Sequence, residues 1–363
     1  MSAGSSPEKI VFLLGAGFSK SAGLPLSVEL ATSFKAFIVD RANQKGPKSL
    51  KLLHFYIEGG IRFQFGKLGL DPSDPVNVEQ IAIAARHLLT RERNPLAPFV
   101  SGWHPHLIQL LSDEPRLLET YLGCFYEHLR IELGFPLAHK IAYIDHLAQI
   151  AAKYGGLDIF TLNYDCCVEK SLSPYCEVHK DMLLVDGFSE KGWQPELFNQ
   201  SGGELKIIRL FKMHGSLDWI NSPEAGLLNI NKIPAELADE FVGMDPHLVF
   251  GTDVKLTGEQ PFFSMAHLLY EQLSKAHLLV VIGYSFSDGY INSIISQAQR
   301  LNVKLLLMNV SPDAERGVGD GEGAWAIRIH KPIPEKAGEL IQGNRLRLEI
   351  EALLKEFSEE APF

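Results

Sequence analysis

The feature that most constrains this chain is a short apolar run that ends in closely spaced glycines. Residues 11–14 read Val-Phe-Leu-Leu, and Gly15, Gly17 and Ser19 follow at once. The run is too short for a helix and is bounded by glycine, which predicts a buried parallel strand. Glycine lets the backbone turn sharply and approach a ligand, and a helix is predicted from about Ser27. A strand, a glycine turn and a helix in this order can present backbone N–H groups to a phosphate.

The same stretch also fits a tight turn inside an ordinary α/β core. It lacks the third glycine of the usual dinucleotide fingerprint, and Lys20 does not complete a P-loop. Taken alone, the stretch leaves both interpretations open, and the later motifs have to decide between them.

Short apolar runs return from residue 157 onward and predict a sheet. We expect strands at residues 157–161, 207–213, 248–250, 277–282 and 303–309, and helices at 265–276, 289–300 and 343–357. Strands that alternate with helices are typical of a doubly wound, mostly parallel α/β sheet. We therefore assign residues 9–44 and 151–363 to one α/β domain.

Residues 45–150 have a different character. Amphipathic helices are predicted at 52–63, 78–89, 98–111, 115–133 and 138–154, and glycine and proline separate them. No β-branched strand pattern interrupts these helices. This part of the chain is therefore expected to be a large helical insertion that follows the first strand and helix.

Composition excludes several classes of protein. The chain has 363 residues, with 44 acidic and 34 basic side chains and no long basic cluster, so nucleic-acid binding is not expected. No run reaches the roughly 18 apolar residues of a membrane span, and the start carries no apolar secretion segment. We therefore expect a cytoplasmic protein. Its four cysteines form no C-x-x-C pair, which argues against a structural zinc site.

Small, polar or ionisable residues follow the main predicted strands. Asn163 and Asp165 come after the strand at 157–161, His214 after 207–213, Gly283, Ser285 and Asp288 after 277–282, and Asn309 ends the last strand. In an open α/β sheet, ligands bind beyond the carboxyl ends of the strands. These residues are therefore expected to line one crevice together with the glycine turn.

His214 is the candidate for acid–base chemistry. It ends an apolar strand and precedes a glycine, which predicts that its side chain leaves the core. Histidine gains and loses a proton near neutral pH, so it suits the role of a general base.

The other candidates keep an ordinary structural alternative. Asn163, Asp165 and Asp288 can cap the helices that follow them. Gly283 and Ser285 can form a plain turn. The functional interpretation therefore depends on whether these residues meet in space.

Two pairs of residues beside these motifs are ambiguous. Phe18 and Tyr164 can stack on a bound ring or pack in the core, and neither interpretation is preferred. Cys166 and Cys167 lie at a predicted helix start, where a thiolate can be stabilised, but buried packing is the favoured interpretation.

Four motifs stand in a characteristic order along the chain. They are Gly15-Ala16-Gly17-Phe18-Ser19, Thr161-Leu162-Asn163-Tyr164-Asp165, Lys212-Met213-His214-Gly215-Ser216-Leu217-Asp218-Trp219 and Gly283-Tyr284-Ser285. In this order they resemble the motifs of sirtuin-like proteins, and most of all those of the bacterial sirtuin-like NAD-hydrolysing effectors of antiphage defence. The resemblance covers residues 9–40 and 155–315, and it implies a sirtuin-like variant of the Rossmann fold.

Two departures separate the chain from deacylase sirtuins. Those enzymes carry Asp-Phe-Arg after the first Gly-x-Pro, whereas here Gly23-Leu24-Pro25 is followed by Leu26-Ser27-Val28. They also carry a four-cysteine zinc module, which this sequence lacks, so no zinc is expected. Protein deacylation is therefore the disfavoured alternative.

The resemblance implies that the chain cleaves NAD to nicotinamide and ADP-ribose, with NAD as substrate and no further cofactor. It assigns Asn163 to positioning of the ribose or the attacking water, and His214 to the general base. It also implies that Gly15, Ala16, Gly17 and Ser19 cradle the pyrophosphate, that Gly283, Ser285 and Asn309 line the adenosine side, and that Asp165 orients or caps.

An unregulated enzyme of this kind would exhaust the NAD of the cell, and the two predicted parts leave no room for a sensor domain. We therefore expect control by assembly into a homo-oligomer or by a separate partner such as a motor ATPase. A module that senses NAD or ADP-ribose without turnover is the alternative. The presence of both Asn163 and His214 speaks against it.

Overall fold

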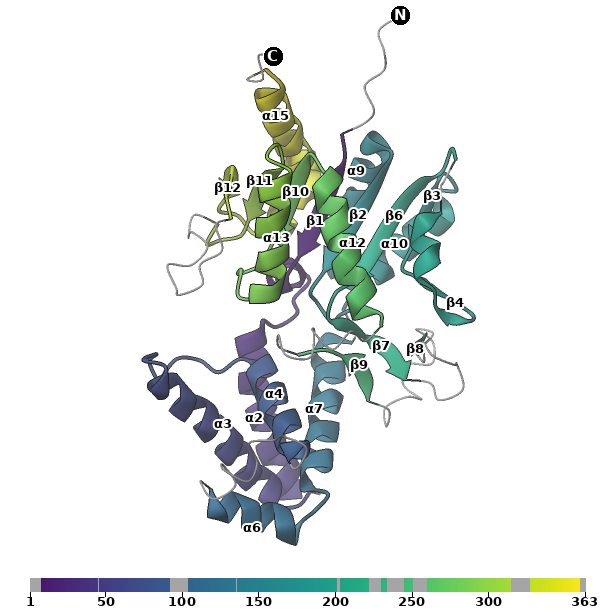
Figure 1. Ribbon diagram of the computed structural model, residues 1–363. Helices are drawn as coiled ribbons and strands as arrows, with labels where there is room; N and C mark the ends of the chain where they lie inside the picture. Colours follow the sequence, from purple (N-terminus) through teal and green to yellow (C-terminus); the bar gives the residue numbers. More distant parts are fainter. Residues whose placement is uncertain are drawn as a thin grey trace, which may run out of the picture. The chain divides into compact units, whose positions relative to one another are not determined.

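The structure, a computed structural model, describes residues 8–44, 46–91, 104–134, 136–200, 203–221, 230–233, 245–250, 260–314 and 327–359. The chain forms two compact units, whose elements are labelled in Figure 1. The sheet unit comprises Met1–Leu24, Pro136–Ala235 and Pro246–Phe363, and the helical unit comprises Pro25–Phe135 and Glu236–Asp245. The helical unit contains most of the insertion predicted at 45–150.

The sheet unit is built on a seven-stranded sheet in which every neighbouring pair of strands is parallel. In sheet order the strands are β12 (Lys331–Ile333), β11 (Leu306–Val310), β10 (Leu278–Ile282), β1 (Ile10–Leu14), β2 (Gly156–Thr161), β6 (Lys206–Lys212) and β3 (Met182–Val185). Every residue of β1 and β10 is buried, which is why both sequences are continuous apolar runs. The predicted doubly wound α/β fold is confirmed.

Helices pack on the sheet according to the alternation of its side chains. Val11, Leu13 and Val281 share a core with α12 (Phe262–Lys275) and α13 (Gly289–Leu301). Helix α9 (His146–Tyr154) contacts β2 and β6, and Figure 1 shows it behind the strands, with α12 and α13 in front. The unit also contains α1 (Ala16–Lys20), α8 (Ala138–Ile141), α10 (Cys167–Val178), α14 (Ala337–Ile341), α15 (Arg345–Glu359) and the 3-10 turns η2 (Ala142–Asp145), η3 (Pro195–Asn199) and η6 (Gln342–Asn344).

One predicted strand lies in a different sheet. β9 (Pro246–Leu248) overlaps the strand predicted at 248–250, but it pairs antiparallel with β7 (Gly215–Asn221), which also pairs with β8 (Ile230–Lys232). Its assignment to the parallel sheet was wrong because a three-residue apolar run does not indicate which strand it pairs with. The sequence also does not predict β3, β12 or the two-residue strands β4 (Phe188–Ser189) and β5 (Gly192–Trp193), which are short and, apart from β5, partly exposed.

The helical unit consists of α2 (Ser27–Gln44), α3 (Ser49–Lys67), α4 (Val78–Leu89), α6 (Pro105–Asp113) and α7 (Leu117–Leu133). The helices predicted at 52–63, 78–89 and 115–133 are confirmed, whereas the first residues of the helix predicted at 98–111 lie outside the described residues. Phe34 of α2 lies in the core of this unit. Its ring centroid is 5.8, 5.4 and 5.2 Å from those of His54, Tyr121 and Phe125, with the rings steeply inclined.

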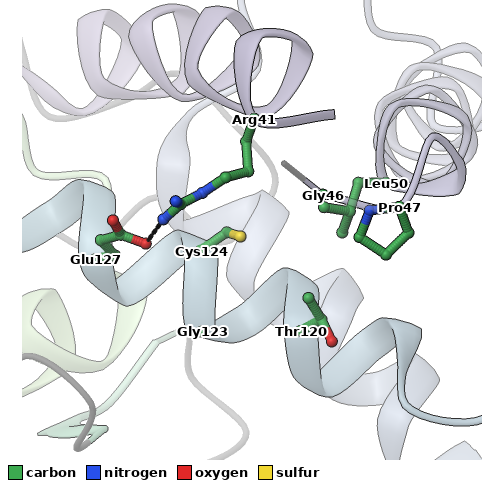
Figure 2. A pocket seen from close by; sticks show the side chains of 8 residues that line it. All are labelled: Arg41, Gly46, Pro47, Leu50, Thr120, Gly123, Cys124 and Glu127. Atoms are coloured by element: carbon green, nitrogen blue, oxygen red, sulfur yellow. Dashed lines mark hydrogen bonds and ion pairs between the residues drawn. The ribbon is translucent and has the colours of Figure 1, made fainter. Parts of the chain in front are cut away.

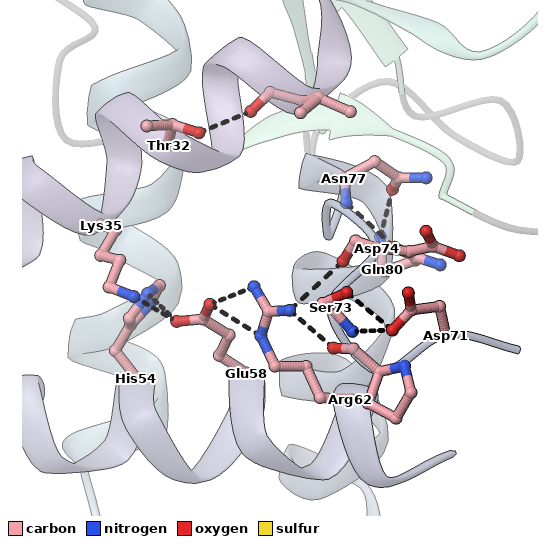
Figure 3. Close-up of polar contacts among 12 residues, drawn as sticks. Thr32, Lys35, His54, Glu58, Arg62, Asp71, Ser73, Asp74, Asn77 and Gln80 are labelled. Carbon is pink, nitrogen blue, oxygen red and sulfur yellow. Dashed lines mark hydrogen bonds and ion pairs between the residues drawn. The ribbon is translucent and has the colours of Figure 1, made fainter. Parts of the chain in front are cut away.

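Glu58 joins two helices of the helical unit (Figure 3). Its carboxylate accepts hydrogen bonds from Lys35 of α2 at 2.8 Å and from Arg62 of α3 at 2.9 Å. Arg62 also donates to the carbonyl oxygens of Pro72 and Asp74, at 2.8 and 3.3 Å. Burial alone raises the pKa of Glu58, but the two cations outweigh burial and lower it, so the carboxylate stays charged and holds α2, α3 and the following loop together.

In the part of the chain that the structure describes, no helix combines the length and the apolar character that crossing a membrane requires.

Candidate active site

The carboxyl ends of β1 and β10 mark the point where the strand order reverses. The chain runs from β1 to β2 on one side of the sheet, and β10 later pairs with the other side of β1. In doubly wound sheets, ligands bind at such a switch point. The loop after β1 carries Gly15, Gly17 and Ser19, and the loop after β10 begins with Gly283. The structure therefore brings these four predicted residues to the switch point.

The two glycine loops lie directly against each other. The N–H of Gly15 donates to the carbonyl of Ile282, and the N–H of Gly17 to that of Gly283, each at 2.9 Å. A Cβ on Gly17 would lie 2.7 Å from the Cα of Gly283, and one on Gly283 would lie 2.2 Å from the nitrogen of Phe18. Gly283 also has a φ of +65°, which other residues rarely adopt. Packing between the two loops therefore requires these glycines, whatever ligand they contact.

Asn163 joins the loop after β2 to the loop after β1. Its amide nitrogen donates to the carbonyl oxygen of Gly15 and to the hydroxyl of Ser19, both at 3.0 Å. Ser19 belongs to α1, a short helix that the sequence does not predict and that begins at the exposed Ala16. Asn163 makes these contacts four residues before α10 begins at Cys167. Its side chain is therefore fixed at the switch point.

Asp165 contacts the start of the next helix. Its Oδ1 accepts a hydrogen bond from the N–H of Cys167 at 2.9 Å, at the first turn of α10. Its backbone carbonyl accepts a hydrogen bond from Nζ of Lys212 at 2.5 Å. These contacts favour the capping interpretation of Asp165 over direct contact with a ligand.

Lys212, the last residue of β6, forms a buried ion pair. Its Nζ lies 2.9 Å from Oε1 of Glu169, and the two side chains are 2% and 9% exposed. Burial lowers the pKa of Lys212, but the surrounding Cys166, Glu169 and Asp218 outweigh burial and raise it. The possible ligand atoms of Cys166, Glu169 and Asp218 lie within 4.8 Å of one another, as in a metal site. The ammonium of Lys212 already supplies a positive charge at this cluster, which favours a structural role for it.

The thiols of Cys166 and Cys167 lie in surroundings that disfavour the thiolate, the form that acts as a nucleophile. Burial raises the pKa of both, and the carboxylates of Asp218 and Asp165 raise it further at Cys166 and Cys167 respectively. A thiolate is therefore disfavoured at each position, which supports the packing interpretation.

His214 lies just beyond the end of β6 and is paired with an acid. Its Nε2 is 3.1 Å from Oδ2 of Asp288. The side chain of His214 is only 4% exposed, whereas the sequence suggests that it leaves the core. Its Nδ1 is buried and has no hydrogen-bond partner among the described residues. A cavity of about 10 Å³, large enough for at most about one water molecule, is lined by Met213, His214, Phe262, Tyr290 and Ile291.

Asn163 and His214 leave the sheet from neighbouring strands. Thr161 of β2 and Lys212 of β6 are partners in the parallel register, and each candidate lies two residues further along its strand. Neighbouring strands lie about 5 Å apart. The ring centroid of Tyr164, the residue after Asn163, is 6.3 Å from that of His214. The structure therefore brings the two predicted catalytic residues to the same edge of the sheet.

Phe18 and Tyr164 are buried among other aromatic side chains. The ring of Phe18 lies 5.6 Å from that of Tyr143, and the ring of Tyr164 lies 5.4 Å from that of Phe250. Both side chains belong to the buried core, which favours packing over stacking on a ligand.

The residues predicted to line the adenosine side are more scattered. Ser285 is exposed, and its hydroxyl donates to that of Ser287 at 3.0 Å. Asn309 is buried in β11, where it pairs in register with Val281 of β10. Its amide nitrogen donates to the carbonyl of Ala314 at 3.3 Å, but its Oδ1 has no partner within the described ranges. That oxygen is a group that a ligand can satisfy.

The contact between Asp288 and His214 is the part of the site that the sequence does not predict. The sequence suggests a helix cap, and the structure confirms the cap, because Oδ1 accepts a hydrogen bond from the N–H of Tyr290 at 3.0 Å. The contact with His214 joins residues 74 positions apart in the sequence. Their strands, β6 and β10, are not neighbours in the sheet, so no local pattern could reveal the pair.

A larger pocket lies within the helical unit and contains none of the predicted site residues (Figure 2). Its volume is about 410 Å³, and it is lined by Arg41, Gly46, Pro47, Leu50, Thr120, Gly123, Cys124 and Glu127. Arg41 and Glu127 form an ion pair with each other, and burial raises the pKa of the Cys124 thiol. The charged groups of this pocket are therefore already matched.

One comparison with known proteins agrees with the motifs. Residues 158–310 match the family model of the SIR2-like domain, which confirms the sirtuin-like resemblance. No curated protein matches the chain. The solved structure of Sir2Tm bound to a propionylated peptide is 12% identical, with a TM-score of 0.42 over 95% of this chain and 94% of that chain. A Sir2 homologue in complex with NAD is 14% identical, with a TM-score of 0.43 over 96% of this chain and 91% of that chain.

Proposed function

We propose that this chain, which contains a sirtuin-like domain, is an NAD glycohydrolase that releases nicotinamide and ADP-ribose. The observation that carries the proposal is the position of Asn163 and His214 at the ends of adjacent strands, beside the paired glycine loops. Depletion of NAD in antiphage defence is the biological role that we attach to this activity.

The reaction breaks the bond between C1′ of the ribose and the nicotinamide nitrogen. Because the nicotinamide ring is cationic in NAD, it leaves as a neutral molecule that takes both bonding electrons and needs no proton. Positive charge develops on the ribose, as in other glycosidic cleavages, and a water oxygen adds to C1′. One proton of that water must pass to a base.

The residues at the switch point suit these steps. His214 accepts the proton at Nδ1, the buried nitrogen for which the described residues provide no partner. Asn163 holds a ribose hydroxyl or the water, and its amide is already oriented by Gly15 and Ser19. The glycine loops allow the backbone to approach the pyrophosphate closely.

The test is the release of nicotinamide from NAD by the purified full-length chain, without any acylated peptide. We expect the wild type to release nicotinamide, and we expect Asn163→Ala and His214→Ala to lower kcat by about 10²- to 10⁴-fold while the circular dichroism spectrum stays unchanged. His139→Ala removes an exposed histidine of α8 and is the matched control, which should keep the wild-type rate.

Two results would overturn this proposal. Binding of NAD without release of nicotinamide would indicate a sensing module. Release that requires an acylated lysine peptide would indicate a protein deacylase.

Control of such an activity is assigned to a homo-oligomer or to a separate partner such as a motor ATPase. Helix α3 of the helical unit exposes Leu52, Phe55 and Phe63, apolar side chains that an interface would bury. The double variant Phe55→Glu/Phe63→Glu should shift the chain to a smaller assembly in size-exclusion chromatography and should change its rate of NAD cleavage. A wild-type monomer with full activity would contradict this part of the proposal.

A further inference from the structure

We propose that Asp288 is a positioning residue that keeps the imidazole of His214 in the tautomer whose Nδ1 can accept a proton. The inference rests on the proposed function, in which His214 is the general base. It adds the reason why one particular nitrogen of the ring is free to react.

The geometry of the pair selects the tautomer. Oδ2 of Asp288 lies 3.1 Å from Nε2 of His214, and the two side chains are 9% and 4% exposed. An ionised carboxylate only accepts hydrogen bonds, so Nε2 carries the hydrogen, and in the neutral ring Nδ1 then keeps the lone pair. A buried nitrogen without a partner is costly in a folded protein unless a ligand or a water molecule meets it.

The carboxylate of Asp288 caps the N-terminus of a helix. Its Oδ1 accepts hydrogen bonds from the N–H groups of Tyr290 and Ile291, at 3.0 and 3.3 Å, at the N-terminus of α13. The partial positive charge of a helix N-terminus favours a carboxylate. One oxygen therefore caps the helix while the other faces the imidazole.

The loop that carries Asp288 is fixed by its own hydrogen bonds. The hydroxyl of Tyr284 accepts from the N–H of Asp288 at 3.1 Å and donates to Oδ1 of Asn292 at 2.9 Å. The amide nitrogen of Asn292 in turn donates to the carbonyl of Phe286 at 2.7 Å. These contacts tie the loop to α13 and hold the backbone of Asp288 in the position from which its carboxylate reaches His214.

The contact matters most during proton transfer. As the oxygen of water bonds to C1′, its proton passes to Nδ1 and the imidazole becomes a cation, while the hydrogen on Nε2 stays in its bond to Asp288. The carboxylate then faces a full positive charge at hydrogen-bond distance, and such a preorganised charge stabilises the transition state. The carboxylate itself takes no proton.

A helix cap alone is the competing explanation, and two variants separate the explanations. Asparagine and serine both cap helices well, so Asp288→Asn and Asp288→Ser should preserve folding. The asparagine oxygen can keep the cap while its NH₂ group donates to Nε2, which moves the ring hydrogen to Nδ1. Serine is too short to reach the ring. If Asp288 only caps α13, both variants should keep the wild-type kcat.

We expect Asp288→Asn to lower kcat by at least about 100-fold, the usual contribution of a general base, with KM unchanged. Asp288→Ser should lower kcat less, because it removes the carboxylate without imposing the wrong tautomer. Asn77→Ala deletes the cap of α4 in the helical unit and is the matched control, which should keep kcat. Wild-type kcat in Asp288→Asn would overturn the inference.

The tautomer can also be measured without turnover. In protein labelled with ¹⁵N-histidine, and with the signals of His214 identified from His214→Ala, the wild type should carry its ring hydrogen on Nε2 and Asp288→Asn should carry it on Nδ1. A hydrogen on Nδ1 in the wild type would refute the positioning role. A wild type with the expected tautomer that fails to cleave NAD would instead refute the proposed function, so the two failures are distinguishable.

Discussion

Replacement of Lys212 by methionine is expected to destabilise the sheet unit strongly. The lysine lies 2.9 Å from Glu169, and both side chains are almost fully buried. Methionine keeps most of the volume but leaves the carboxylate of Glu169 without its cation. Removal of one partner of a buried pair costs about 3–5 kcal/mol, a large share of the roughly 5–15 kcal/mol that holds a typical domain folded.

The ionisation of Glu169 determines how the stability lost in Lys212→Met depends on pH. Without the ammonium, burial keeps the pKa of Glu169 above its value in the unfolded chain. A group whose pKa is raised by folding stabilises the fold below its unfolded pKa and loses that effect as the pH rises through its folded pKa. The cost of Lys212→Met should therefore be small near pH 5 and largest near pH 8.

Urea unfolding of four proteins tests this reasoning: the wild type, Lys212→Met, Glu169→Leu and the double variant. The double variant removes both charges, so it should recover to within about 1–2 kcal/mol of the wild type. Lys336→Met is the matched control, because Lys336 and Glu339 are 71% and 66% exposed and should contribute less than about 0.5 kcal/mol. Additive costs in the double variant, or a stable Lys212→Met protein at pH 8, would refute the argument.

Two further predictions concern His54 and Gly283. Burial lowers the pKa of His54 to about 4, so between pH 6.5 and 4 the unfolded chain binds a proton that the folded chain does not, and the free energy of unfolding should fall by up to about 3 kcal/mol. His54→Gln, which can still form a hydrogen bond in place of the 2.8 Å contact between His54 and Tyr121, should remove this fall in denaturant titrations at pH 7 and pH 4. Gly283→Ala places a methyl group 2.2 Å from the nitrogen of Phe18 at a φ of +65°. It should lower the free energy of unfolding, measured by thermal denaturation, by at least about 2 kcal/mol. An unchanged midpoint would contradict the packing described for that loop.

The strands at the centre of the sheet could be predicted because burial on both faces requires a continuous run of apolar residues. β1 and β10 are continuous apolar runs, and the helix predicted at 78–89 matches α4 at both ends because Asn77 and Thr90 flank a strong apolar period. The strands at the edges of the sheet lack such a run. β12 has only three residues and includes an exposed proline, so nothing in its sequence separates it from a loop.

The candidate site was predictable to the extent that it follows the strand ends. Asn163 and His214 were placed by that rule, and the structure brings them to one edge of the sheet. The hydrogen bonds of Asn163 to Ser19 and of His214 to Asp288 were not predictable, because each joins segments far apart in the chain. Side-chain contacts of this kind depend on loop conformations that no local pattern determines.

The contact between the loops of Gly15, Gly17 and Gly283 has a consequence for how this sequence can vary. A methyl group at any one of the three positions meets backbone atoms of the opposite loop. Every residue has these backbone atoms, so a second substitution elsewhere cannot remove them to make space. A substitution at any one of the three glycines therefore disturbs the same contact between the two loops. Saturation mutagenesis under selection for function should find all three depleted of every alternative, with no second-site suppressor among side-chain changes.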